Sequence, residues 1–190
     1  MSNRIELEKS YIISKEDEEK IEEKLKLAEF KLVSEENECD TYFSDKNLKF
    51  IKDKVCLRTR KINNECLELT YKPKSTEETE KYGKREVNIQ LKLEDENDIK
   101  FIIEQLGYKE YVSFKKYRKT FSKKVNGFDR NVMIDELDGI GKFIELEILS
   151  DIKDKQTMEK ELKDFIGEFG FDKLQIKKLP YRDIAKNGTI

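Results

Sequence analysis

The sequence predicts an α+β protein with about eight antiparallel strands and a few flanking helices. Three observations support this fold class. Eight segments alternate apolar and polar residues, three others repeat apolar residues at helical spacing, and no repeat or long linker divides the chain. A chain of 190 residues is also long enough for one domain with a substantial core. We therefore expect residues 1–190 to form a single domain.

The strands are predicted from alternation, because successive side chains of a strand point to opposite faces. The segment DELDGIGKFIELEIL ends in the strictest example: Ile144, Leu146 and Ile148 share one face, and Glu145 and Glu147 share the other. The predicted strands are, in chain order, residues 5–13, 38–44, 55–62, 67–72, 85–93, 111–121, 130–136 and 142–149.

Apolar residues at helical spacing predict three helices. Ser14, with Asp17 three residues later, is the expected N-cap of the first helix. Gly107 and Gly170 are expected to end the second and the third. The three apolar stripes are Ile21, Leu25, Ala28 and Leu32, then Ile99, Ile102, Ile103 and Leu106, then Met158, Leu162, Phe165, Ile166 and Phe169. Residues 73–83 are predicted to form a polar loop, and the tail 177–190 shows no clear pattern.

Composition excludes several classes of function. The chain has 39 Lys and Arg against 41 Asp and Glu, so the basic excess typical of nucleic-acid-binding domains is missing. It has no histidine, which excludes a histidine base and histidine-ligated zinc, so a metal would be held by carboxylates, which favours Mg²⁺ or Mn²⁺.

The sequence also bears on location and assembly. The three cysteines have no metal-site spacing and suit a reducing compartment. The N-terminal segment lacks a signal-peptide core, and no apolar run reaches membrane-spanning length. We therefore expect a cytoplasmic protein without membrane or nucleic-acid partners. A homodimer is compatible with the sequence, although no apolar stripe demands one.

The side chains opposite the apolar faces are mostly charged. Arg58 and Arg60 share a strand face with no acid between them, and Glu145 and Glu147 share one with no base between them. One interpretation is a half-buried sheet with its charged face in water, as antiparallel sheets often have. The other is a closed barrel whose interior is charged. Such an interior would suit a chain of phosphates with a divalent metal, because Arg binds phosphate oxygens bidentately and carboxylates bind the metal.

The order of these motifs resembles that of the CYTH family, also called triphosphate tunnel metalloenzymes, which includes class IV adenylate cyclases, thiamine triphosphatases and inorganic triphosphatases. The resemblance covers most of the chain, from about residue 5 to residue 170. The segments that carry it are ELEKS, CDTYF, CLRTR, LTYKPK, KREVN, FKKYRKTF and DELDGIGKFIELE. The resemblance implies an eight-stranded antiparallel β-barrel that forms a triphosphate tunnel, with flanking helices.

The resemblance also implies a role for each matching residue. The substrate would be ATP, inorganic triphosphate or thiamine triphosphate, with Mg²⁺ or Mn²⁺ as cofactor. The phosphate-binding residues would be Arg58, Arg60, Lys72, Lys84, Lys116, Arg118 and, at the looser tail, Lys178. The metal ligands would be Glu6, Glu8, Glu86, Glu145 and Glu147. Lys72 and Asp135 would serve catalysis.

The chain departs from the family pattern at three positions. Ser10 stands where the first strand of the family has Lys, Lys84 stands for Arg, and Asn88 stands for Glu. These departures leave three hypotheses: a metal-dependent triphosphate enzyme, a triphosphate- or polyphosphate-binding protein with weakened catalysis, and an ordinary β-protein with a solvated charged face. Within the first, the segment CDTYF favours a class IV cyclase-like enzyme without separating it from a triphosphatase.

Overall fold

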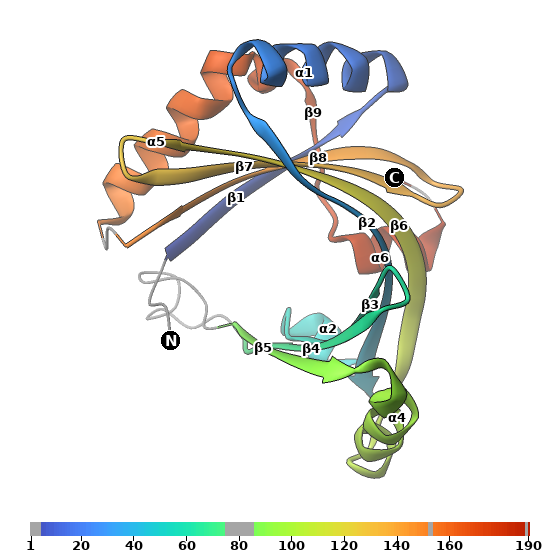
Figure 1. Ribbon diagram of the computed structural model, residues 1–190. Helices are drawn as coiled ribbons and strands as arrows, with labels where there is room; N and C mark the ends of the chain where they lie inside the picture. The colour runs from blue at the N-terminus through green and yellow to red at the C-terminus, as the bar shows by residue number, and fades with distance from the viewer. Residues whose placement is uncertain (1–4, 75–85, 152–153, 189) are drawn as a thin grey trace. The chain divides into compact units, whose positions relative to one another are not determined.

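The structure is a computed structural model that describes residues 5–74, 86–151, 154–188 and 190 (Figure 1). Its strands are β1 (Ile5–Ile13), β2 (Lys31–Asp45), β3 (Cys56–Ile62), β4 (Cys66–Lys72), β5 (Val87–Lys92), β6 (Tyr108–Val125), β7 (Phe128–Leu137), β8 (Gly141–Ser150) and β9 (Gln175–Ile176). The helices are α1 (Lys15–Leu27), α2 (Lys49–Lys52), α4 (Glu96–Gln105), α5 (Lys155–Phe169) and α6 (Tyr181–Asn187), with 3₁₀ turns η1 (Leu93–Asp95) and η2 (Phe171–Lys173). The predicted α+β class is confirmed.

The strands form one large sheet whose neighbours follow the order β5-β4-β3-β2-β6-β7-β8-β1-β9. The pairs β1·β8, β7·β8, β2·β3, β3·β4 and β4·β5 are all antiparallel. Among the described residues the order ends at β5 and β9, so the sheet is not closed. The ninth strand, β9, has only two residues, which is too short for alternation to predict it.

The chain divides into two compact units. Unit 1 contains Met1–Glu35, Tyr117–Leu179 and Ile190, and unit 2 contains Glu36–Lys116 and Pro180–Thr189. The two long strands β2 and β6 each contribute residues to both units, whereas β1, β7, β8 and β9 belong to unit 1 and β3, β4 and β5 to unit 2. The expectation of a single domain over 1–190 stays a prediction.

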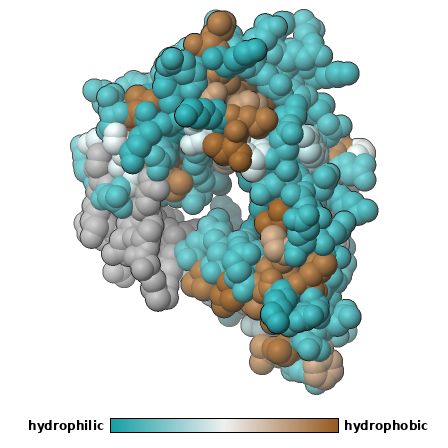
Figure 2. All heavy atoms as spheres, viewed as in Figure 1, coloured by the Kyte–Doolittle hydropathy of each residue, from teal (hydrophilic) through white to brown (hydrophobic). Residues whose placement is uncertain are grey.

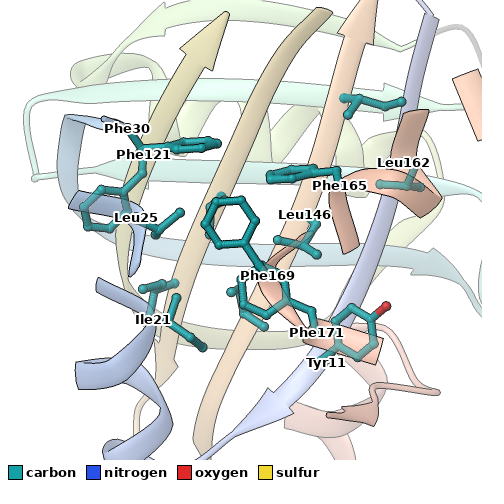
Figure 3. Close-up of a cluster of buried hydrophobic side chains, with 14 of the residues drawn as sticks. Tyr11, Ile21, Leu25, Phe30, Phe121, Leu146, Leu162, Phe165, Phe169 and Phe171 are labelled. Carbon is teal, nitrogen blue, oxygen red and sulfur yellow. The ribbon is translucent and has the colours of Figure 1, made fainter. Parts of the chain in front are cut away.

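The core of unit 1 lies between its strands and the helices α1 and α5 (Figures 1 and 3). Leu146 in β8, Leu25 in α1 and Phe165 in α5 are each fully buried in it. Phe165 stacks on Phe30 with ring centroids 5.9 Å apart and meets Phe169 edge-on at 5.6 Å. The apolar face predicted for residues 142–149 is therefore the face that packs against the helices.

The predicted helix ends of unit 1 are confirmed. Ser14 caps α1: its hydroxyl accepts from the Asp17 N–H, and the Asp17 carboxylate accepts from the Ser14 N–H. Gly170 ends α5 with φ +71°, a conformation that glycine adopts without a Cβ penalty. Leu32, however, lies exposed in β2 rather than in the helix, because α1 ends at Leu27.

Unit 2 contains β3, β4 and β5 together with α2, α4 and α6. In α4 only Ile103 is buried, whereas Phe101, Ile102 and Leu106 are exposed, and Figure 2 shows apolar side chains over this helix. In α6, the helix within the tail that sequence could not assign, Arg182 is buried and donates to the Val55 carbonyl at 2.6 Å. Among the described helices, none is both long enough and apolar enough to cross a membrane.

The aromatic cluster of unit 1 gives a test of the fold. Phe165→Ala removes a fully buried ring from this cluster and is expected to lower the free energy of unfolding by about 3–5 kcal/mol. The matched control is Phe101→Ala, which removes an exposed ring from α4. It is expected to change the free energy of unfolding by about 0.5 kcal/mol or less. Urea unfolding followed by circular dichroism measures both variants. Equal shifts for the two would contradict the core described here.

Candidate functional site

The polar face of unit 1 is built by antiparallel pairing of β1, β8 and β7. Glu8 in β1 lies opposite Glu147 in β8, and Ser10 lies opposite Glu145. On the other side of β8, Asn131 in β7 lies opposite Glu147. Residues opposite each other in an antiparallel pair share a face. The pairing therefore gathers the carboxylates that alternation placed on separate strands.

A buried ion network holds one part of this face. Asp135, which is fully buried, accepts two hydrogen bonds from Arg118, at 2.6 Å from Nε and 2.5 Å from Nη2. The same Nη2 lies 2.6 Å from Oε2 of Glu145. The resemblance assigned Asp135 to catalysis, and the structure places its carboxylate on the guanidinium of Arg118. This arrangement fixes the orientation of Arg118.

The other oxygen of Glu145 accepts from two further residues. Ser10 Oγ donates to Oε1 at 3.2 Å, and Lys177 Nζ donates to the same atom at 2.9 Å. Lys177 comes directly after β9, and its own backbone N–H donates to the Ser10 carbonyl at 2.9 Å. Glu145 is therefore surrounded by two cations and a hydroxyl, which makes it a poorer ligand for a metal than its neighbour Glu147.

Glu147 is the carboxylate best suited to a divalent cation. Burial raises its pKa, and the nearby charges of Glu8 and Glu145 raise it further, although a hydrogen bond from Asn131 at 2.7 Å opposes them. A carboxylate crowded by like charges is stabilised when a cation binds beside it. Within the described residues, no cluster of three acidic or thiol groups encloses a cation by itself. Glu8 and Glu147 therefore fit Mg²⁺ or Mn²⁺ bound through one or two carboxylates, with water and phosphate completing its coordination.

The predicted phosphate-binding residues of unit 2 are paired with carboxylates from a neighbouring strand. Arg60 donates two hydrogen bonds to Asp40, at 2.6 and 2.7 Å, and its third nitrogen lies 3.0 Å from Glu38. Lys116 Nζ lies 2.9 Å from Glu38, and both side chains are buried. Burial alone would raise the pKa of Asp40, but Arg60 and Arg58 lower it to about 2. In unit 2 the strand that carries Arg58 and Arg60 therefore pairs with the strand that carries Glu38 and Asp40.

Arg58 differs from Arg60 in one respect. It donates to Thr70 at 3.0 Å and lies 3.5 Å from Glu68, yet its buried Nε has no hydrogen-bond partner among the described residues. Burial alone would lower the pKa of Arg58, but Tyr42 and Asp40 raise it, so the guanidinium stays charged. An unpaired buried N–H is costly unless a ligand or water accepts from it. Arg58 is the cation in unit 2 most clearly arranged for an anionic ligand.

The remaining predicted residues fall into four groups. Lys72 and Glu86 form an ion pair at 2.5 Å, so the two residues meet although they were assigned to different ligands. Lys178 is exposed, whereas its neighbour Lys177 reaches Glu145. Glu6 lies on β1 two residues before Glu8, on the same face. Lys84 lies outside the described residues.

Sequence reasoning missed several residues of these faces. Glu38 and Asp40 are two apart in a predicted strand, so alternation places them on one face. Asn131 carries no charge to mark it. Lys177 lies in a tail that pairs with β1 through only two residues, which is too short a strand to show alternation.

Three proteins illustrate the similarity of this chain to known ones. It is 29% identical over 171 residues, 89% of this chain and 93% of the other, to a Methanocaldococcus jannaschii protein named "Putative adenylate cyclase". A Vibrio parahaemolyticus protein also named a putative adenylate cyclase has a similar structure, with a TM-score of 0.72, 19% identity and coverage of 95% and 97%. So does a Hippeastrum protein, described as a putative adenylyl cyclase with a dominant triphosphatase activity, with a TM-score of 0.69, 13% identity and coverage of 98% and 97%.

The family match agrees with these likenesses and with the strand motifs described above. The CYTH domain family matches residues 4–177, which include the predicted site residues other than Lys178. This chain belongs to the CYTH domain family.

Proposed function

We propose that this protein is a Mg²⁺- or Mn²⁺-dependent enzyme that acts on triphosphates, either cyclising ATP to cyclic AMP and pyrophosphate or hydrolysing a triphosphate. The observation that carries the proposal is the burial of the charged strand faces: Asp40, Lys116, Asp135 and Glu145 are all buried. A solvated face would leave these groups exposed. Burying charges costs several kcal/mol per ion unless partners compensate, and here the partners are other charged side chains of the same faces. These partners hold the charged groups in fixed positions, which suits the binding of a charged ligand.

The family supports the same class of reaction. CYTH proteins are in general metal-dependent enzymes acting on triphosphates. The three similar proteins described above are named "putative" adenylate or adenylyl cyclases, and the Hippeastrum protein is described as having a dominant triphosphatase activity. Both reactions attack a phosphorus atom of a triphosphate, with water as the nucleophile in hydrolysis and a ribose hydroxyl in cyclisation. A protein built to bind the triphosphate could therefore carry out either one.

In this proposal the cations recognise phosphate oxygens. Arg58 donates from its unpartnered Nε, and Lys116 adds a buried positive charge. Asp40 stays ionised at any pH above about 2 and so holds Arg60 in place throughout the range in which an enzyme is assayed. Lys72, Lys84 and Lys178 are proposed as further phosphate contacts on the resemblance alone.

The carboxylates of unit 1 are proposed to hold the metal. Glu8 and Glu147 are the principal ligands, with Glu6 beside Glu8 and Glu145 beside Glu147. When bound, the metal would neutralise phosphate charge and activate the nucleophile. Asp135 holds the Arg118 guanidinium in a fixed orientation, so that Arg118 can stabilise negative charge without reorganising.

The three cysteines Cys39, Cys56 and Cys66 are all free thiols. Free thiols persist in a reducing compartment. We therefore propose a cytoplasmic location.

The experiment that tests the function is ³¹P NMR of the protein with ATP and, separately, with inorganic triphosphate, in Mg²⁺ and then in Mn²⁺. Cyclic AMP with pyrophosphate would establish a cyclase. Pyrophosphate with orthophosphate, from inorganic triphosphate, would establish a hydrolase. Unchanged substrate with metal-dependent line broadening would instead identify a binding protein, the alternative suggested by Ser10 and Asn88. Unchanged substrate with unchanged lines would refute the proposal.

The unpartnered nitrogen of Arg58 gives the first prediction about the site. Arg58→Ala is expected to lower kcat/KM for triphosphate by about 10²–10³-fold, the scale of losing a preorganised donor to a developing charge. The control is Lys115→Ala, which removes an exposed charge beside Lys116 on β6 and should leave kcat/KM unchanged. Phosphate release measures both. A similar loss in the two variants would show a general charge effect instead.

The carboxylate Glu147 gives the second prediction. Glu147→Gln removes a charge from the Glu8–Glu147 pair and is expected to weaken Mn²⁺ binding at least about tenfold, by analogy with the loss of metal-site groups. Calorimetric titration with Mn²⁺ alone measures the affinity without any need for turnover. The control is Glu23→Gln on the exposed surface of α1, which should bind Mn²⁺ as the parent protein does. Unaltered affinity in Glu147→Gln would exclude Glu147 as a ligand.

A further inference from the structure

The contact between the tail and β1 brings a lysine to the position that Ser10 leaves without a charge. The N–H of Lys177 donates to the Ser10 carbonyl at 2.9 Å. The Lys177 ammonium and the Ser10 hydroxyl both donate to Oε1 of Glu145, at 2.9 and 3.2 Å. The two side chains therefore meet at one carboxylate oxygen, although they lie 167 positions apart in the numbering of the chain.

Lys177 is unusual among the lysines of the tail because its side chain is only 8% exposed. Lysine is seldom buried without a carboxylate partner, since removing an ammonium from water is costly. Its neighbour Lys178 is exposed, as is Lys173 in η2. The tail thus directs one specific ammonium group onto the polar face of unit 1, where Glu6, Glu8, Glu145 and Glu147 lie.

A structural role alone would not require a charge at this position. The backbone already pairs the tail with β1, through the β9 residues Gln175 and Ile176 and through the N–H of Lys177. Glu145 already has a guanidinium partner, since Arg118 lies 2.6 Å from its other oxygen. Glu145 therefore does not need Lys177 for charge compensation. The Lys177 ammonium is better suited to binding an anionic ligand.

We propose that Lys177 is a substrate-binding residue that places on the tail the positive charge absent from position 10 of β1. This inference rests on the proposed function and deepens it. When a triphosphate binds, the ammonium of Lys177 would donate to a phosphate oxygen and offset negative charge there, as Lys does at other phosphate sites. Ser10, being short and neutral, leaves room beside Glu145 for this side chain.

The first test separates charge from structure. Lys177→Gln keeps a hydrogen-bond donor for Glu145 but removes the charge, and Lys177→Arg keeps the charge. Lys177→Gln is expected to lower kcat/KM for inorganic triphosphate by about 10²-fold, on the scale of a lost donor to transition-state charge, and Lys177→Arg by markedly less. The unfolding midpoint without ligand should stay near that of the parent for both. If Lys177→Gln lowers both kcat/KM and the unfolding midpoint, the proposal is overturned in favour of a structural role.

The second test moves the charge back to β1. The double variant Ser10→Lys with Lys177→Gln is expected to recover at least about tenfold of the kcat/KM lost in Lys177→Gln, because a lysine at position 10 would reach the same carboxylate from the paired strand. No recovery would count against the idea that the two positions share one role. Lys9→Ala serves as the control, since it removes an exposed charge next to Ser10 on the opposite face and should not alter kcat/KM.

A ligand-binding readout distinguishes this inference from the proposed function. Inorganic triphosphate with Mg²⁺ should raise the unfolding midpoint of the parent protein, because a ligand that binds the native state stabilises it. This rise should be smaller for Lys177→Gln and unchanged for Lys9→Ala. If the parent shows neither turnover nor a rise, the proposed function fails and the inference fails with it. If the parent shows both and Lys177→Gln equals it, only the inference fails.

Discussion

The need to compensate buried charge constrains the polar faces of both units. Asp135 is fully buried, and an ionised carboxylate there without a partner would cost about 3–5 kcal/mol. Arg118 meets that need with two hydrogen bonds and also bonds Glu145, which in turn accepts from Lys177. Each of these side chains therefore depends on the next. The network ties β6, β7, β8 and the tail of unit 1 into one electrostatic arrangement.

The same constraint shapes how a ligand can bind. In unit 2, Arg58, Arg60, Lys72 and Lys116 each lie within 4 Å of a carboxylate, at Glu68, Asp40, Glu86 and Glu38. In unit 1, the polar face built by β1, β8 and β7 carries more carboxylates than cations. An anion alone would have to compete with carboxylates for the cations, and a metal alone would have to compete with cations for carboxylates such as Glu145. Under the proposed function, a divalent metal would bind carboxylate oxygens and phosphate oxygens would accept from the cations, so neither ligand would have to compete alone.

Alternation predicted most of the fold, because burial on one face leaves a periodic record in the sequence. β1 has the predicted bounds, and the caps at Ser14 and Gly170 lie where local chemistry placed them. The errors arise where that record is weak. Leu32 continues the stripe of α1 by spacing, but β2 begins at Lys31, and pairing with other strands overrides the helical pattern. The stripe of α4 predicted four core residues, and only Ile103 is buried, since amphipathic spacing shows that a face is apolar and does not show what covers it.

The site residues were predicted one strand at a time. The limits of that prediction follow from this. Motifs predicted Arg58, Asp135, Glu145 and Glu147 as site residues, and alternation placed Glu145 and Glu147 on one face. They could not show that Asp40 lies opposite Arg60, or that Ser10 and Lys177 share an oxygen of Glu145, because register and tail pairing are tertiary properties. Taken alone, Ser10 indicates a lost charge and a weakened enzyme. Taken with Lys177, it fits the proposal that the tail supplies this charge, since electrostatic stabilisation depends on position in space and not on position in the chain.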